Sequence, residues 1–307
     1  MVDVPEDRSW RPARSQLLIS IQNVAADPRP SCLMRMDVTT QRKDWIEVGI
    51  GEPLVSGLGI CADDQYVYHV CIAESDFGTH LTVLDRQSLR VVHVQRLPEV
   101  VDGHSVARQG EELIVVSTGT DEIVAYRLHD FELGSARVVW TPTESGTDTH
   151  HINSLAVANG ELLCSAFGPK DGDSWATTRT GYVLNVTTGN VLLGGLRQPH
   201  SANWNQGQLF VCNSLEGSVN TCEGVVAYLY GYARGLTFSP DGTMYAGTSL
   251  ARRPIEASDD TGVFRNPSDP GDLHGQCAVS QMAHIGGHRL EMALAPFGNE
   301  IYDIVVL

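Results

Sequence analysis

The chain has 307 residues, of which 42% are hydrophobic and 19% are charged, and it contains 30 Gly and 14 Pro. These values are typical of a globular protein with many tight turns. The formal net charge of −16 argues against nucleic acid or an anionic membrane surface as a general partner.

The chain is predicted to consist of a polar N-terminal arm, residues 1–15, and a single domain, residues 16–307. The opening "MVDVPEDRSWRPARSQ" lacks the apolar core of a signal peptide. No run approaches the ~18 apolar residues that a membrane-spanning helix needs. The seven cysteines are odd in number, lack a CxxC pair and lie mostly in apolar runs, so we interpret them as reduced core thiols. We therefore expect a cytoplasmic protein.

Residues 16–307 are predicted to form strands and turns without long helices. Two apolar runs around a turn of Gly, Asp or Asn form a unit that recurs along the chain. The unit is found at residues 56–72, 101–120, 150–168, 199–214 and 233–249. Repeated antiparallel strand pairs at intervals of 34 to 49 residues are typical of a β-propeller.

The strands at the two ends of the chain predict how the propeller closes. The N-terminal part supplies only three strands, "QLLISIQ", "SCLMRMDV" and "DWIEVGI", and the C-terminus supplies one more, "EIYDIVVL". We predict that residues 301–307 pair with residues 16–22. The result is an all-β fold, a six-bladed β-propeller of four-stranded antiparallel blades, in which closure of the ring removes the exposed sheet edges that an open array would leave.

One position recurs at the start of the first strand of each unit, which lines the central channel. The residues at this position, here called the column, are Leu58, His104, Asn153, His200 and Arg234. His151 lies two residues before Asn153 and therefore on the same strand face. The closing strand contributes Glu300, Tyr302 or Asp303, in a register that the sequence leaves open. Column residues from several blades converge on one axis, where they can form a site.

The column residues are consistent with two kinds of chemistry. His104, His151, His200 and Glu300 are candidate ligands of a divalent metal, for which Fe, Zn, Mn and Ca all remain open. Alternatively, the histidines act as acid and base, Arg234 holds a carboxylate or a developing oxyanion, and Asn153 orients the ligand. The alternative is that these residues have a structural role: the histidines hydrogen-bond neighbouring blades or channel water, and Arg234 pairs with Glu300 or Asp303.

Two insertions are predicted to lie over the face where the column begins. They are residues 168–180, which contain Trp175, and residues 250–275, which contain Arg252 and Arg253. Long loops in compact folds are usually functional or disordered. We therefore count Trp175, Arg252 and Arg253 as candidate ligand-binding residues. We expect residues 250–275 to form a mobile cover, the alternative being a plain surface excursion.

The segments "HINSLAV", "PHSANWNQGQLFVCNS", "ARGLTF" and "EIYDIVVL" resemble a bacterial family of six-bladed propellers. That family is described only as a domain of unknown function and is similar in plan to the NHL and SMP-30-like propellers. The resemblance covers roughly residues 100–307. It implies the fold and implies no reaction.

Together these features favour an enzyme that acts on a small polar or anionic metabolite in the channel. No GxSxG, GxxxxGK[ST], HExxH or dinucleotide fingerprint is present, so no organic cofactor is expected. Lyase, isomerase or hydrolase chemistry fits best, and oxygen chemistry would follow if a bound metal were iron. The alternative is a non-catalytic propeller that binds a peptide or protein partner on the same face, with structural histidines in its channel.

Overall fold

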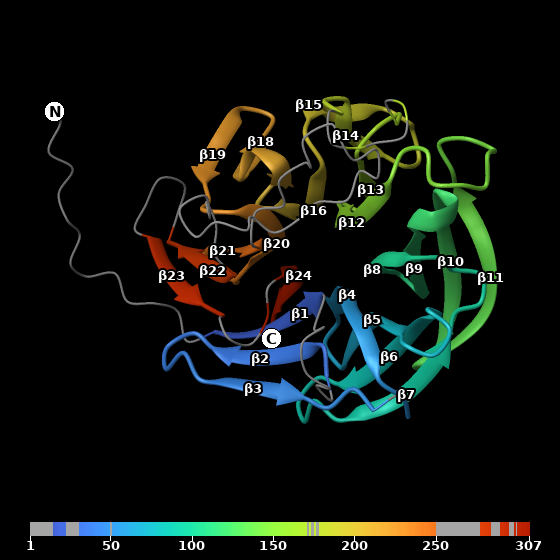
Figure 1. Ribbon diagram of the computed structural model, residues 1–307, viewed down its shortest axis with the longest axis vertical. Coiled ribbons are helices and arrows are strands. Elements are labelled where there is room, and N and C mark those ends of the chain that lie inside the picture. The colour runs from blue at the N-terminus through green and yellow to red at the C-terminus, as the bar shows by residue number, and fades with distance from the viewer. Residues whose placement is uncertain are drawn as a thin grey trace, which may run out of the picture.

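The computed structural model describes residues 15–22, 31–49, 51–170, 172, 175, 178–249, 277–283, 289–294, 298 and 300–307. In these residues 24 strands form six sheets of four, arranged as a ring about a central channel (Figure 1). The predicted six-bladed β-propeller is therefore confirmed. The other regular elements in the described residues are two short 3-10 turns, η1 (Thr118–Thr120) and η2 (Ser214–Glu216). No helix in the described ranges is long and apolar enough to cross a membrane.

The first three blades contain the two ends of the chain and the strands that follow the N-terminus. The first blade consists, from the channel outward, of β24 (Glu300–Val306), β1 (Gln16–Gln22), β2 (Leu33–Asp37) and β3 (Lys43–Ile46). The second consists of β4 (Leu54–Ala62), β5 (Tyr66–Ala73), β6 (Thr79–Asp85) and β7 (Val91–Arg96). The third consists of β8 (Gly103–Gln109), β9 (Glu112–Ser117), β10 (Glu122–His129) and β11 (Glu132–Trp140).

The remaining blades follow the chain in order. The fourth consists of β12 (Ile152–Ala158), β13 (Glu161–Ala166), β14 (Gly181–Asn185) and β15 (Val191–Leu196). The fifth consists of β16 (Pro199–Asn205), β17 (Gln208–Asn213), β18 (Ser218–Thr221) and β19 (Gly224–Tyr228). The sixth consists of β20 (Tyr232–Phe238), β21 (Met244–Ser249), β22 (Ala278–Met282) and β23 (Arg289–Ala293).

The first blade joins the two ends of the chain and closes the ring. Strand β24 pairs antiparallel with β1, with Leu17 opposite Val306 and Gln22 opposite Glu300. This is the pairing predicted for residues 301–307 with residues 16–22. Leu17, Ile19 and Ile301 are fully buried, so the closure also packs an apolar core. Closing the ring in this way satisfies backbone groups that an open edge would expose.

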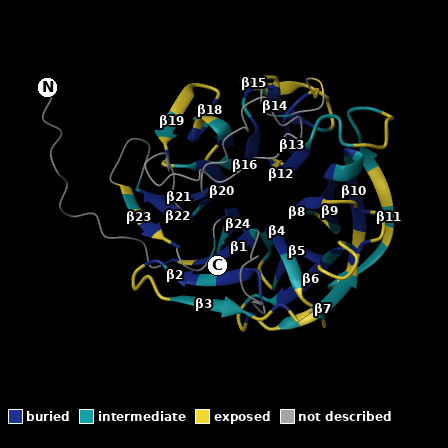
Figure 2. Ribbon diagram, in the orientation of Figure 1, coloured by how far each residue is buried: buried dark blue, intermediate teal, exposed yellow. Residues whose placement is uncertain are grey.

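The apolar core lies between the blades, and burial falls from the channel outward (Figure 2). The inner strand β12 is buried at six of its seven residues, whereas β15, at the outer edge of the same blade, is mostly exposed. Each inner strand is covered on both faces by neighbouring blades, which explains the continuous apolar runs in the sequence. Because the core is elsewhere, the channel can hold polar side chains.

Each innermost strand carries an irregularity in its pairing close to the column position. In the first blade, Asp303 pairs with Ser20 and Ile301 with Ile21, so Tyr302 is the extra residue of the bulge. In the other five blades the register shifts between Gly57 and Ile60, Gly103 and Val106, Ile152 and Ser154, His200 and Asn203, and Arg234 and Leu236. Such a β-bulge bends a strand and re-aims its side chains. The six bulges confirm the column and place Tyr302 in it, which settles the register that the sequence left open.

Candidate functional site

The residue that follows the column position connects neighbouring blades. In four of the six blades its side-chain oxygen accepts a hydrogen bond from a backbone N–H of the next blade, and in the other two the residue is Gly59 or Gly235. The bonds are Leu155 N–H to Ser105 Oγ (3.1 Å), Ala202 N–H to Ser154 Oγ (3.0 Å), Gly235 N–H to Ser201 Oγ (2.8 Å) and Ile60 N–H to Asp303 Oδ2 (3.0 Å). These serines therefore face the gaps between blades, as strand alternation predicts, and they fix the column residues around the channel.

A closed ring of side chains, here called the collar, surrounds the upper end of the channel, where the innermost strands begin. Its members, in spatial order, are His104, His151, Phe167, His200, Tyr232, Arg234 and Tyr302. Neighbouring ring centroids, with Arg234 Cζ counted as one centre, lie 4.3 to 5.6 Å apart. Six members are at most 6% exposed. The His151 side chain, at 16%, is the member that is open to the upper mouth.

The three collar histidines are each held through Nδ1. His104 Nδ1 lies 2.9 Å from the carbonyl oxygen of Asp102, and His200 Nδ1 lies 2.9 Å from the carbonyl oxygen of Gln198. A carbonyl only accepts, so in both rings Nδ1 carries the proton and Nε2 is the acceptor. His151 Nδ1 lies 2.9 Å from the Asp148 carboxylate, at Oδ2.

The electrostatics of the collar keep two of these rings neutral. Burial lowers the pKa of His104, and it lowers the pKa of His200 well below its usual range. The positive charge of Arg234 lowers both pKa values further. His104 and His200 are therefore neutral at pH 7 and present unprotonated Nε2 atoms.

Arg234 is a buried cation in the collar and is only 5% exposed. Its guanidinium lies over the rings of Tyr232 and Tyr302, at 5.1 and 5.0 Å from their centroids, and Nη1 donates to Gln22 Oε1 at 2.6 Å. In the described part of the chain it forms no ion pair with a carboxylate. The pairing of Arg234 with Glu300 or Asp303, which belonged to the structural alternative, is absent among the described residues, and Asp303 accepts backbone N–H groups instead.

Three polar atoms of the collar are buried without a hydrogen-bond partner among the described residues. They are Arg234 Nε, His200 Nε2 and Tyr302 Oη. Burial raises the pKa of Tyr302 well above its usual range, against the opposing charge of Arg234, so Tyr302 remains a hydroxyl. Buried polar groups are almost always paired. Three unpaired atoms in one ring therefore indicate a place for ligand or ordered water.

The histidines and Glu300 do not assemble into the metal site that their sequence positions suggested. Within the described ranges, no three His, Cys, Asp or Glu side chains are placed to hold a metal ion. The ring of Phe167 lies between those of His151 and His200, at 4.3 and 5.2 Å, and Arg234 adds positive charge. The residues present therefore do not fit Fe, Zn, Mn or Ca, because the packing that fills the collar separates the candidate ligands.

The other predicted site residues have varied positions. Asn153 is fully buried and bonded within its own blade, accepting from Ser165 Oγ at 2.7 Å and donating to the His151 carbonyl at 3.2 Å. It therefore supports the backbone of His151. Trp175, from insertion 168–180, lies against the collar, with its ring centroid 5.5 Å from that of His151. Arg252, Arg253 and the predicted cover 250–275 lie outside the described residues.

The sequence did not indicate a role for Asp121, which holds the segment of residues 149–151 at the upper end of the channel. Its buried carboxylate accepts hydrogen bonds from Thr149 N–H at 2.6 Å, Thr149 Oγ1 at 2.8 Å and His150 N–H at 2.7 Å. These bonds hold the segment that carries His151 at the entry to β12. Asp121 precedes that segment by 28 residues and lies in another blade, so no local pattern in the sequence reveals the contact.

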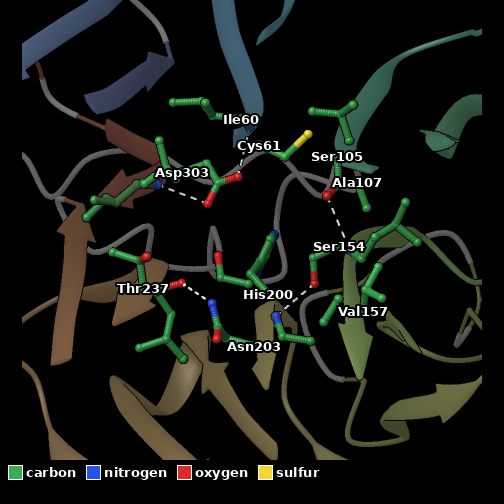
Figure 3. A pocket seen from close by; sticks show the side chains of 18 of the residues that line it. Ile60, Cys61, Ser105, Ala107, Ser154, Val157, His200, Asn203, Thr237 and Asp303 are labelled. Atoms are coloured by element: carbon green, nitrogen blue, oxygen red, sulfur yellow. Dashed lines mark hydrogen bonds between the residues drawn. The ribbon is translucent and has the colours of Figure 1, made fainter. Parts of the chain in front are cut away.

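A cavity of 280 Å³, here called the lower cavity, occupies the channel below the collar, towards the ends of the innermost strands (Figure 3). Of the collar residues, His200 and Tyr302 line it, and Arg234, His104 and His151 do not. The remaining lining includes Asp303, Thr237 and Asn203. The lower cavity therefore lies next to the collar on the side away from Arg234, His104 and His151.

Comparison with known proteins places the chain in a family and a fold. Residues 78–307 match the family described as Domain of unknown function (DUF4915). No curated protein matches the chain.

Similar solved structures include a chain of the nidogen/laminin complex (TM-score 0.60, 11% identity, covering 95% of this chain and 97% of that one). They also include a luciferin-regenerating enzyme (TM-score 0.52, 10% identity, covering 81% of this chain and 75% of that one). A third is regucalcin from Agrobacterium tumefaciens, described as a calcium-binding protein (TM-score 0.51, 16% identity, covering 76% of this chain and 73% of that one). At this identity the likeness shows the fold alone.

Proposed function

The chain belongs to this family of unknown function, and from its collar we propose that the upper end of the channel binds a small anionic metabolite and performs acid–base chemistry on it. The observation that carries the proposal is the buried guanidinium of Arg234, which no described carboxylate neutralises. Tyr302 Oη adds a second unpaired donor at the collar.

The cost of burying Arg234 explains why an anion is the expected ligand. An unpaired buried charge costs several kcal/mol, and two tyrosine rings offset only about 1 to 2 kcal/mol each. A carboxylate or phosphate of the ligand would supply the missing partner, since guanidinium binds such groups through two parallel hydrogen bonds. The protein therefore carries an unfavourable charge that ligand binding would relieve.

The histidines supply the acid–base groups of the proposal. His151 Nδ1 bonds the Asp148 carboxylate, an arrangement that fixes a ring and stabilises it when Nε2 takes up a proton. We assign His151 Nε2 as the base that takes a proton from the bound anion or from a water molecule. Neutral His104, 5.3 Å away by ring centroid, is the neighbouring acid–base group, and Arg234 holds the negative charge that develops. This set suits a lyase, isomerase or hydrolase.

Metal-assisted catalysis is not part of the proposal. Regucalcin is described as a calcium-binding protein, but calcium requires several oxygen ligands, and the collar offers imidazoles and a guanidinium. Similarly, a luciferin-regenerating enzyme shares the fold, which supports only the statement that such propellers include enzymes.

The alternative function is binding of a peptide or protein partner at the upper face, with the collar as a structural plug. A chain of similar fold occurs in the nidogen/laminin complex. The two alternatives differ at Arg234. A structural plug gains nothing from an unneutralised cation, whereas an anion site requires it.

The test is a thermal-shift and calorimetric screen of the whole chain with small mono- and dicarboxylates and phosphate esters. We expect at least one anion class to raise Tm in the native protein and to lose that effect in Arg234→Gln. Arg137→Gln, which changes an exposed arginine on an outer strand, is the matched control and should keep the shift. A panel without effect on the native protein, or a shift that survives in Arg234→Gln, contradicts the proposal.

A further inference from the structure

One wall of the lower cavity is an imidazole that the proposed function does not use. His200 is 2% exposed, and Figure 3 shows it among the side chains that line the cavity. Its Nδ1 lies 2.9 Å from the Gln198 carbonyl oxygen, and burial lowers its pKa well below the usual range. His200 therefore contributes a neutral wall.

Asp303 places a carboxyl group in the same cavity. Among the described residues its oxygens accept two backbone N–H groups, those of Ile60 at 3.0 Å and Ile304 at 2.9 Å, and its side chain is half-buried (Figure 3). No cationic side chain of the described residues forms an ion pair with it. Arg108, which also lines the cavity, lies 3.7 Å from Asp63 instead. Burial raises the pKa of Asp303 to about 7, as expected for a carboxyl group without a countercharge.

We propose that the lower cavity is a second ligand site, which binds a small organic ammonium ion. The ammonium group donates to the Asp303 carboxylate, with which no cationic side chain of the described residues forms an ion pair. Among the side chains that complete the wall are Ala62, Ala107, Ala202, Leu236 and Trp204, which suit an apolar body. The cavity of 280 Å³ holds about nine water volumes, enough for a compact amine.

This site is independent of the proposed anion site. Arg234 does not line the lower cavity, and the Asp303 carboxylate accepts from the backbone of Ile60 and Ile304 and not from Arg234. Failure of one site leaves the other intact, since each depends on a different side chain and on a ligand of opposite charge.

The experiment is calorimetric titration of the whole chain at pH 8 with butylammonium chloride and, separately, with butan-1-ol. The two probes have nearly the same size and differ in charge. We expect butylammonium to bind at least tenfold more tightly than the alcohol. Asp303→Asn should weaken butylammonium at least tenfold, while Asp44→Asn, which changes an ion-paired aspartate on the outer strand β3, should leave it unchanged.

A second variant keeps the test valid if Asp303→Asn folds poorly. Ala62→Leu narrows the cavity at a half-buried wall position without changing any charge, and it should weaken butylammonium at least fivefold. Equal binding of butan-1-ol, absence of butylammonium binding up to millimolar concentration, or binding that survives in both variants overturns the proposal. The anion screen with Arg234→Gln is unaffected by any of these results.

Discussion

The two ends of the channel carry opposite charges, although they are built from the same repeated strand. Arg234 of the sixth blade lies in the collar, and Asp303 of the adjacent first blade lines the lower cavity. They do not pair, because Tyr302 fills the column position of its strand and directs Asp303 towards Ile60 of the second blade. A shift of one residue along a strand therefore decides which compartment a charged group serves.

Both charged groups are expected to lower the stability of the folded protein. Both charges are held in sites that leave them without a protein countercharge, and both would be stabilised by a ligand. Elsewhere in the channel the same strand positions hold neutral groups, such as Leu58 in the column and Gly59 after it. The two proposals place a ligand of opposite sign at each of these charges.

The largest effect on stability is expected when Phe167, the collar side chain between His151 and His200, is removed. Phe167 is 4% exposed and lies between the rings of His151 and His200, so Phe167→Ala should lower the free energy of unfolding by about 3 to 5 kcal/mol. It should also weaken butylammonium, because the field of Arg234 would reach the lower cavity. Denaturant unfolding and calorimetry measure the two effects. Phe77→Ala, at a side chain that is 70% exposed, is the control and should change stability by less than about 0.5 kcal/mol.

The next largest effect is expected from Asp121→Ala, which should weaken the proposed anion site and leave the proposed ammonium site intact. Asp121→Ala leaves the N–H groups of Thr149 and His150 without their acceptor and should cost about 2 to 4 kcal/mol. Anion binding at the upper end should weaken, because the segment carrying His151 loses its anchor, while butylammonium binding should persist. Asp130→Ala is a matched control, since Asp130 has a φ of 56° against 54° for Asp121 but is exposed. Equal loss in both variants would assign the effect to backbone strain.

A smaller effect is expected from pH at the lower end alone. Asp303 has a raised pKa of about 7, and the ammonium ion binds its ionised form, so affinity should rise about tenfold between pH 6 and pH 8. The groups around it keep one charge state in this range: the pKa of Cys61, Cys212 and Tyr302 is raised by burial, that of His200 is lowered, and Arg108 stays cationic. Calorimetry across this range measures the change. A flat profile, or one that persists in Asp303→Asn, would exclude Asp303 as the titrating group.

The same raised pKa makes a prediction about stability without ligand. The folded state holds the Asp303 proton more tightly than the unfolded chain does, so this group contributes to stability at low pH. That contribution declines as pH rises from about 4 to 7. Saturating butylammonium should restore Tm more at pH 8 than at pH 6.

The smallest effect should leave both ends unchanged. Ser201→Ala removes one hydrogen bond between blades, that from Gly235 N–H at 2.8 Å, and should cost about 1 kcal/mol. Neither the anion shift nor butylammonium affinity should change by more than about twofold, a free-energy change of roughly 0.4 kcal/mol. Ser135→Ala, at an exposed serine on β11, should have no effect on unfolding. A loss of ligand binding in Ser201→Ala would mean that the blade contacts control the site directly.

The sequence predicted the fold through its repeats and their strand count. Two apolar runs around a turn recur often enough to define the blades, and the missing fourth strand of the first blade required the C-terminus to close the ring. The column was also predictable, because equivalent positions of repeated strands face one axis. Trp175 was placed over the site from the position of its loop, and its contact with His151 agrees.

The assembly of the site could not be predicted in the same way. Spacing placed His104, His151 and His200 near one axis, but it did not show that Phe167, from the end of β13, lies between two of them. Glu300, Tyr302 and Asp303 were equally plausible in the column until the bulge opposite Ser20 and Ile21 fixed the register. The role of Asp121 could not be predicted because its hydrogen-bond partners lie in the next blade.

By itself, then, the sequence determined what is periodic: the number of blades, the strand order, the closure and the residues that face the channel. The tertiary structure alone decided which of those residues meet. The physical reason is that strand pattern depends on local alternation and burial, whereas the collar depends on packing between blades that are distant in sequence. Six bulges and a few buried contacts set whether a side chain enters the collar, the lower cavity or the gap between blades. Those contacts place Phe167 between His151 and His200, and among the described residues the expected metal cluster does not form.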